Sequence, residues 1–462
     1  MVQSKSRSFV NLNVNPCKMC MPMGASLAFE GIEDSMVLIH GSQGCSTYIR
    51  RHIATHFNEP IDIASSSLSE QGTVYGGAAN LVQGLKNVAA IYNPKVIGVL
   101  TTCLAETIGE DITHIIKESG IASELKGIDI IPVPTPGYAA SEYNGYFVAL
   151  KKIVEFYAKE PKVKTKHINV IVTDLTPADI RELKRILNLF EVEYTIFPDI
   201  SETLDAPYKK GFDRKTEGGT TKSQLKRMSA AIATIEFGWM TPVGLSSGRY
   251  LEENFGVPLY SCPLPIGLKG TDLFLEAISN IFDKQVPEEL KKARGRMLDA
   301  MIDSHKLNRE GRSVIYGNPE LIYAVSNLCI ENGIEPVVIA TGTDTNPLED
   351  QLEKLLVKYQ YKPIILKDCD FESIQKKAIE QKANLLIGNS DGKFMKEKEN
   401  IPLVRIGFPI HDNIGASRQL FIGYEGSLRF LDQITNTLID KKHEAYRDKM
   451  YNKYFVNEGL IL

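Results

Sequence analysis

The chain has 462 residues, of which 43% are hydrophobic and 24% charged, and its formal net charge is −4. This length exceeds a single hydrophobic core, so two to four domains are expected. The charge balance lacks the basic footprint of a nucleic-acid-binding protein, and no apolar run is long enough to cross a bilayer. The first residues lack the apolar middle region of a secretory signal, so we expect a cytoplasmic protein with reduced cysteines.

Short apolar runs alternate with amphipathic segments along nearly the whole chain. The runs are rich in β-branched residues and apolar on both faces, which is typical of parallel strands covered by helices. The expected strands are 36–40, 96–102, 128–135, 168–174, 194–198, 313–317, 335–343, 363–368, 384–389 and 402–409. Helical patterns such as 177–190 and 271–284 lie between them. The alternation predicts an α/β fold with mostly parallel, doubly wound sheets.

Two polar segments interrupt this pattern. The first is "AKEPKVKTKH" (158–167), and the second is "DKQVPEEL" (283–290), in which Pro287 suits the first turn of a following helix. We therefore expect three α/β domains. Their limits are 1–165, 166–285 and 286–462. The final residues, from Lys441 onward, indicate a surface helix and tail.

Three cysteines of the expected first domain lie at positions that suit ligands. Cys45 comes after the strand 36–40 through "GSQG", and Cys103 ends the strand 96–102 and precedes "LAETIGEDITHIIKE", which we expect to be helical. Ligands of open α/β sheets gather at the carboxyl ends of strands, so the two thiols can converge. Cys103 also lies near an expected helix N-terminus, which stabilises a thiolate. Cys20 lies in the bent, small-residue segment "KMCMPMGA".

Spacing alone leaves several interpretations of the cysteines open. A cysteine after a strand is often a small buried residue, and we expect this of Cys262, Cys329 and Cys369. Cys17 and Cys20 form a C-x-x-C pair, which is typical of redox or zinc sites, but no second pair follows at zinc-finger spacing. Thiolates without a histidine cluster suit an iron–sulfur site better than a hard metal ion.

Four stretches, taken together and in order, resemble the β subunit of nitrogenase component 1. They are "VNPCKMCMPMGA", "HGSQGCSTYIRRHIATHFNEP", "SSSLSEQGTVYGG" and "TTCLAETIGEDI". The similarity continues through "EGGTT", "LPIGLKGTDLFLEAIS", "RGRMLDAMIDSH" and "RIGFPIHD", so it spans most of the chain. The resemblance implies a fold of three Rossmann-like domains, the same number as the composition breaks indicate.

The resemblance also implies a cofactor for the first domain. In that family three cysteines of each subunit hold the P-cluster, a large iron–sulfur cluster shared between the α and β subunits. The matching residues here are Cys20, Cys45 and Cys103, and Cys17 is not expected to be a ligand. Some members have a serine that supplies an oxygen ligand on oxidation, but Gly137 stands at that position here. The sequence therefore departs from the family pattern at this one ligand.

Further residues match partner contacts of the family. Tyr75 in "TVYGG" takes the place of an interface aromatic where an ATP-dependent iron protein docks, although it also suits an ordinary loop. Asp299 and Asp303 share one helix face, and Glu59 matches the third acidic member of a divalent-cation site at a subunit contact. Without the resemblance, the aspartate pair would be interpreted as a solvated surface.

The expected function is that of a β subunit in an α2β2 heterotetramer with a homologous α subunit. Its cluster would relay electrons from the iron protein to a catalytic cluster in the α subunit. No phosphate-binding G-x-x-x-x-G-K-[ST] motif occurs, so nucleotide hydrolysis belongs to the partner. One alternative is a non-catalytic scaffold for building the iron-molybdenum cofactor, but such scaffolds typically lose most of the three cysteines. Another is a nitrogenase-like reductase of carbon–sulfur or tetrapyrrole substrates.

Overall fold

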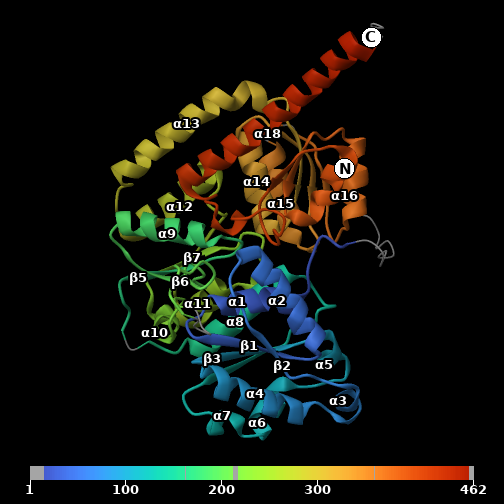
Figure 1. The fold of residues 1–462 in the computed structure, drawn as a ribbon. Coiled ribbons are helices and arrows are strands. Elements are labelled where there is room, and N and C mark those ends of the chain that lie inside the picture. The colour runs from blue at the N-terminus through green and yellow to red at the C-terminus, as the bar shows by residue number, and fades with distance from the viewer. Residues whose placement is uncertain (1–14, 162, 212–216, 358, 360, 457–462) are drawn as a thin grey trace.

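Three parallel β-sheets form the framework of the protein in a computed structural model that describes residues 15–161, 163–211, 217–357, 359 and 361–456. The first sheet has the order β2-β1-β3-β4, the second β6-β5-β7-β8, and the third β11-β10-β9-β12-β13. Every strand pairing in them is parallel, and the three sheets and their helices occupy separate regions of the molecule (Figure 1). The structure thus confirms the predicted α/β class.

Each sheet is built from one continuous part of the chain. The strands of the first are β1 (Ser35–His40), β2 (Ile63–Ser65), β3 (Val96–Thr101) and β4 (Asp129–Val133). Those of the second are β5 (His167–Ile171), β6 (Glu193–Phe197), β7 (Ala233–Phe237) and β8 (Leu259–Cys262). Those of the third are β9 (Arg312–Tyr316), β10 (Glu335–Ala340), β11 (Ile364–Leu366), β12 (Leu385–Gly388) and β13 (Leu403–Arg405).

Helices connect these strands. Those of the first part are α1 (Met21–Glu30), α2 (Gln43–Phe57), α3 (Glu70–Tyr75), α4 (Ala78–Tyr92), α5 (Cys103–Thr107), α6 (Ile112–Glu118), α7 (Ile121–Glu124) and α8 (Glu142–Tyr157). Those of the second are α9 (Pro177–Leu189), α10 (Lys222–Arg227), α11 (Ser247–Phe255) and α12 (Gly267–Phe282). Those of the third are α13 (Glu288–Asn308), α14 (Pro319–Glu331), α15 (Asn346–Val357), α16 (Phe371–Glu380), α17 (Lys393–Glu399) and α18 (Gly423–Tyr451).

All ten predicted strands are present, and three further strands escaped prediction. These are β2, β7 and β8. The predicted helix after Cys103 is wrong as a single element, because it breaks into α5 and α6. Gly109, between the two helices, has a φ of +79°, a left-handed conformation that glycine adopts without strain and that ends the first helix. Pro287 lies at the N-cap of α13, one position before its first turn.

Both faces of the first sheet are buried, as the apolar strands predict. Val37 and Ile39 of β1 belong to a core cluster with α1 and α8, whereas Met36 and Leu38 belong to one with α4 and α6. Successive side chains of a strand point to opposite faces, so each face of β1 contacts a different helical layer. This packing fixes the carboxyl end of the strand, from which the first candidate ligand loop leaves.

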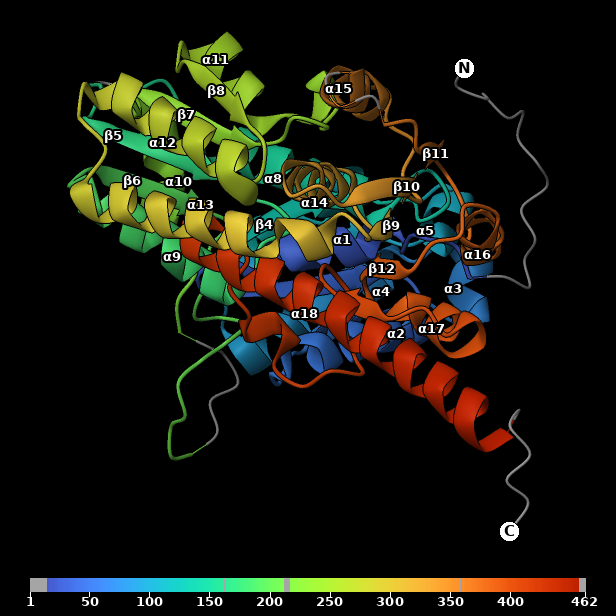
Figure 2. The same ribbon diagram turned by 90° about the horizontal axis from the view of Figure 1, so that it is seen from above.

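The third part of the chain returns to contact the second. α13 and α18 lie side by side in both views, and the far end of α18 extends away from the body of the molecule (Figures 1 and 2). Before α18, the backbone N–H groups of Phe421 and Ile422 donate to Asp179 Oδ1 at 2.7 and 3.1 Å. The predicted surface helix is confirmed, and the expected tail at 457–462 lies outside the described residues. No helix in the described ranges combines the length and hydropathy that a bilayer crossing requires.

A buried hydrogen-bond network joins the three parts of the chain. Glu320 of α14 is fully buried, and its Oε1 accepts from the Met240 backbone N–H at 2.6 Å and from the Tyr143 hydroxyl at 3.1 Å. Burial is the largest cause that raises the pKa of Glu320 to about 8. At neutral pH the carboxyl group is therefore mostly protonated, and among the described residues no cation contributes to its pKa shift.

Replacing Glu320 with glutamine is expected to make the protein more tolerant of rising pH. The native state keeps a proton that the unfolded chain releases, so stability falls as the pH rises from the unfolded pKa of 4.5 to the folded pKa of about 8. The complete window corresponds to roughly 5 kcal/mol. Glutamine stays neutral, so the melting temperature of Glu320→Gln relative to wild type should increase across this window. Glu118→Gln, at the exposed end of α6, should show no such trend, and a pH-independent difference for Glu320→Gln would contradict the assignment.

Candidate metal centre

Cys20 lies where two helices of the first part touch. It is the N-cap residue of α1, and it forms an isolated antiparallel bridge with Ser141. The preceding Met19 is fixed on α8, because its N–H donates to Glu142 Oε2 at 2.6 Å and its carbonyl accepts from Glu142 N at 3.0 Å. Burial is the largest cause that raises the pKa of Glu142 to about 7. The backbone around Cys20 is thus held by the start of α8.

Cys45 and Cys103 follow adjacent strands of the first sheet. β1 and β3 pair in parallel through to His40 and Thr101, and each strand is followed by a helix that begins near the cysteine. Cys45 is the third residue of α2, and Cys103 is the first residue of α5. All three candidate cysteines therefore lie at helix N-termini, where the helix dipole stabilises a thiolate.

Gly137 shows that these segments converge. A Cβ atom placed on Gly137 would lie 2.9 Å from Cys103 Sγ and 3.3 Å from Cys20 Cβ. A second close approach joins the loops after β1 and β3, because a Cβ on Gly41 would lie 2.2 Å from Thr102 Oγ1. With contacts this short, a side chain at either glycine would require the facing Cys103 or Thr102 side chain to move. The two glycines therefore allow the cysteine-bearing segments to approach one another.

The pKa of Cys20 also reflects the proximity of Cys45 and Cys103. Burial is the largest cause that raises its pKa to about 11, and charge interactions with the nearby Cys45 and Cys103 raise it further. A hydrogen bond from the Met23 backbone opposes this shift. Metal cations reverse such an effect, because a bound cation favours the deprotonated sulfur. The site thus has the thiol chemistry that a metal–sulfur group requires.

The three cysteines differ in exposure, and Cys20 and Cys45 pack against the core of the first part. Cys103 is exposed, and Cys20 and Cys45 are half-buried. Within the described ranges, no three His, Cys, Asp or Glu side chains are grouped closely enough to hold a single metal ion. A multinuclear cluster places its ligands farther apart than one ion does. The exposed Cys103 side chain leaves this side of the site open to a bound group or a partner surface.

Comparison with known proteins assigns the chain to a family. A family model described as "Nitrogenase component 1 type Oxidoreductase" matches residues 20–439, which include all three cysteines. The chain belongs to this family. Membership makes it a subunit of a nitrogenase-type oxidoreductase, and the family implies metal–sulfur clusters in general.

Relatives from several organisms support the same branch of the nitrogenase component 1 family. The chain is 35% identical to a nitrogenase molybdenum-iron protein beta chain of Methanococcus maripaludis over 94% of this chain and 96% of that protein. It is 35% identical to the corresponding chain of Clostridium pasteurianum, with coverage of 93% and 94%. A solved structure, nitrogenase Cp1 at pH 6.5, superimposes with a TM-score of 0.90 at 34% identity over 95% of both chains. The chain thus falls in the nitrogenase component 1 β family.

The other cysteines have different surroundings. Cys262 and Cys329 are buried in the core, as predicted, whereas Cys369 is only half-buried. The Cys17 N–H donates to the Cys369 carbonyl at 2.9 Å. A hydrogen bond with the Cys369 thiol is the largest cause that raises the pKa of Cys17 well above its usual value, and burial is the second. Cys17 is thus engaged with Cys369 in the core of the third part, although it is only three residues from Cys20.

Tyr75 lies at the surface, at the C-terminal end of α3, and hydrogen bonds hold the segment that follows it. It is the last residue of α3 and is 83% exposed, and Val74 beside it is 74% exposed. The N–H of Gly77 donates to Glu110 Oε1 at 2.5 Å, and Glu110 Oε2 lies 3.5 Å from Nε2 of the buried His40. Sequence reasoning missed this support. His40 and Glu110 lie in two of the stretches that carry the resemblance, but they are distant in sequence and no local pattern predicts their contact.

The three acidic residues of the expected cation site are not grouped within one chain. Asp299 and Asp303 are exposed on α13 and form no ion pair or hydrogen bond with another described residue. Glu59 follows the end of α2, and its Oε1 accepts from the Ala206 N–H at 3.2 Å. Burial raises the pKa of Glu59. A site that uses all three would need residues of more than one chain.

Proposed function

We propose that this chain is the β subunit of a nitrogenase-type component 1 reductase and holds half of a P-cluster-type iron–sulfur cluster shared with a homologous α subunit. The ligands would be Cys20, Cys45 and Cys103. The observation that supports the proposal is that all three cysteines lie at helix N-termini of the first part, with Cys103 Sγ and Cys20 Cβ both next to Gly137. When bound, the cluster would relay electrons from an ATP-dependent iron protein to a catalytic cluster in the α subunit.

The residues of this chain would set the geometry and charge of that site. Three helix N-termini offset the negative charge of the thiolates. The Ser42 hydroxyl donates to Cys45 Sγ at 3.7 Å, and hydrogen bonds to sulfur tune the reduction potential of such a group. Gly44 is exposed, and a Cβ there would meet only Ser42 Oγ at 3.7 Å, so its backbone is open to a bulky group or partner surface.

Gly137 limits the ligand set that this chain offers. A side chain at this position would contact Cys103 Sγ and Cys20 Cβ, so glycine is the residue that fits the observed packing. The serine oxygen that some family members supply here is absent. We infer that this chain contributes thiolates alone at this corner of the site, in the reduced and oxidised states.

The assembly would be an α2β2 heterotetramer in the cytoplasm. Asp299 and Asp303 of one β subunit and Glu59 of another would share a divalent cation at a subunit contact. The exposed positions of Asp299 and Asp303, and the lack of cationic partners for them among the described residues, support this arrangement. Tyr75 and Val74 would form the surface on which the iron protein docks, because they are large, exposed and held by the Gly77–Glu110 hydrogen bond.

The test of this function is electron flux through the complete complex. The anaerobically purified complex, mixed with its iron protein and ATP, should couple ATP turnover to substrate reduction. Tyr75→Ala should lower the rate about tenfold without lowering iron content, because exposed aromatic residues often dominate docking. Tyr446→Ala, an exposed tyrosine on the extended end of α18, is the matched control and should leave the rate unchanged.

Other outcomes separate the remaining candidates. Transfer of a cofactor to an apo-enzyme without ATP-coupled turnover would establish a scaffold instead. Turnover with carbon–sulfur or tetrapyrrole compounds, and none with dinitrogen, would establish a nitrogenase-like reductase of other substrates. Retention of all three cysteines supports the reductase over the scaffold.

A further inference from the structure

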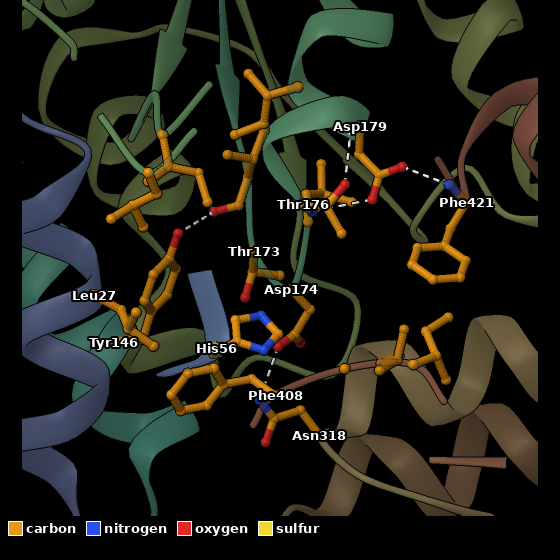
Figure 3. Close-up of a pocket in the computed structure, with 18 of the residues that line it drawn as sticks. Leu27, His56, Tyr146, Thr173, Asp174, Thr176, Asp179, Asn318, Phe408 and Phe421 are labelled. Atoms are coloured by element: carbon orange, nitrogen blue, oxygen red, sulfur yellow. Dashed lines mark hydrogen bonds between the residues drawn. The ribbon is translucent and has the colours of Figure 1, made fainter. Parts of the chain in front are cut away.

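A cavity of about 90 Å³ lies between the three parts of the chain, apart from the candidate cysteines. Its walls come from α1 and α2, from the loop after β5, and from the segment after β13 (Figure 3). It is therefore at the carboxyl ends of parallel strands, where open α/β sheets bind ligands. A cavity of this volume has room for several water molecules or a small organic molecule.

Asp174 places an unsatisfied acceptor at this cavity. Its Oδ1 accepts from Asn318 Nδ2 at 2.8 Å, while Oδ2 is buried and has no hydrogen-bond partner among the described residues. A buried carboxylate oxygen without a donor is costly. A ligand that donates a hydrogen bond to Oδ2 would remove this cost. The ligand group next to Asp174 should therefore be a hydrogen-bond donor.

The other charged groups of the wall are acidic. Glu142 and Asp179 also line the cavity, but backbone N–H groups already donate to both. The lining contains no lysine or arginine. His56 is neutral, because burial lowers its pKa to about 4, and its Nδ1 accepts from the Ile410 N–H at 2.9 Å. The cavity therefore offers carboxyl groups and no cation to balance them.

Most of the remaining wall is apolar, although the hydroxyl-bearing Thr173, Thr176, Tyr143 and Tyr146 also line the cavity. The apolar part includes Leu27, Phe57, Leu204, Leu321 and Phe408, and Figure 3 shows Leu27 and Phe408 among the residues around the labelled polar groups. A largely apolar cavity with a small number of polar groups is typical of a small-molecule site. The polar groups would contact a polar end of the ligand, and the apolar residues would contact its hydrocarbon part.

We propose that this cavity binds a small primary alkylammonium ion, whose N–H groups donate to Asp174 Oδ2 and whose hydrocarbon part lies among the apolar residues. An alcohol of the same size could donate but would leave the carboxylate charge unbalanced. A carboxylate would add a fourth acidic group to the cavity. This site is independent of the proposed cluster and is not required by it.

The test compares three ligands of nearly equal size on the purified complex by isothermal titration at neutral pH. They are propylammonium, which is ionised there as a lysine side chain is, 1-propanol and propionate. Propylammonium should bind about tenfold or more tightly than 1-propanol, and propionate should not bind, because a charge-assisted hydrogen bond is stronger than a neutral one. This comparison uses the unmodified protein and does not depend on the folding of a variant.

Asp174→Asn locates the binding. The variant keeps an oxygen for the Asn318 hydrogen bond but loses the negative charge, so the preference for propylammonium should disappear. Asp440→Asn, on the exposed side of α18, is the matched control and should bind as wild type does. Absence of saturable propylammonium binding, equal binding of the three ligands, or full retention of binding in Asp174→Asn would each overturn the proposal.

Discussion

Cys103→Ala should purify with a sharply reduced iron and sulfide content while keeping its fold. Changes to groups that merely support a metal ligand typically cost about 10- to 100-fold in affinity, so removal of a ligand should cost at least that much. The exposed Cys103 side chain forms no hydrogen bond with a described residue, so its truncation should leave the packing intact. The measurements are iron and sulfide per protein, with circular dichroism as the check on folding.

The matched control for this loss is a cysteine outside the site. Cys262→Ala removes a buried thiol from the edge strand β8 and should lower stability modestly without changing iron content. Cys45→Ala should behave as Cys103→Ala does, because both residues follow adjacent strands of one sheet. Equal iron content in wild type and Cys103→Ala would refute the assignment of these residues as cluster ligands.

The strands that sequence reasoning missed have identifiable causes. β7 carries Glu236, a fully buried acid that interrupts the apolar pattern and accepts from the N–H groups of Ser247 and Gly248 at 3.1 and 3.3 Å. β2 spans three residues and β8 only four, and both lie at sheet edges. Unlike the short edge strands β11 and β13, which lie in the predicted apolar runs 363–368 and 402–409, β2 and β8 each contain a serine, Ser65 or Ser261, that breaks the apolar run of a buried strand.

Part of the candidate site could be predicted from the sequence, and part could not. The positions of Cys45 and Cys103 at strand ends follow from local sequence, because parallel strands deliver their following loops to one edge. The contact of Gly137 with Cys20 and Cys103, and the cavity at Asp174, depend on segments that meet only after folding. Asp174 is the last residue of the run 168–174, which was predicted only to be a strand. Nothing in the sequence distinguished this aspartate from an ordinary residue at the end of a strand.

Gly24→Ala is expected to be strongly destabilising, because α1 and α8 touch at this point through their backbones. A Cβ on Gly24 would lie 1.8 Å from the Glu142 carbonyl oxygen and 2.9 Å from Tyr146 N. Gly145 makes the reciprocal contact, since a Cβ there would lie 2.1 Å from the Met21 carbonyl oxygen. Backbone cannot yield as a flexible side chain does, so the two helices must separate, at a cost of about 3 kcal/mol or more.

This separation should also affect the cluster site, because Cys20 is the N-cap residue of α1. Gly24→Ala should therefore lower both the melting temperature and the iron content, whereas Cys103→Ala should lower the iron content alone. Gly295→Ala is the matched control, since its Cβ would enter open space on α13 and should stabilise the helix by up to about 1 kcal/mol. If Gly24→Ala melts at the wild-type temperature, the close contact of α1 with α8 cannot be what fixes Cys20.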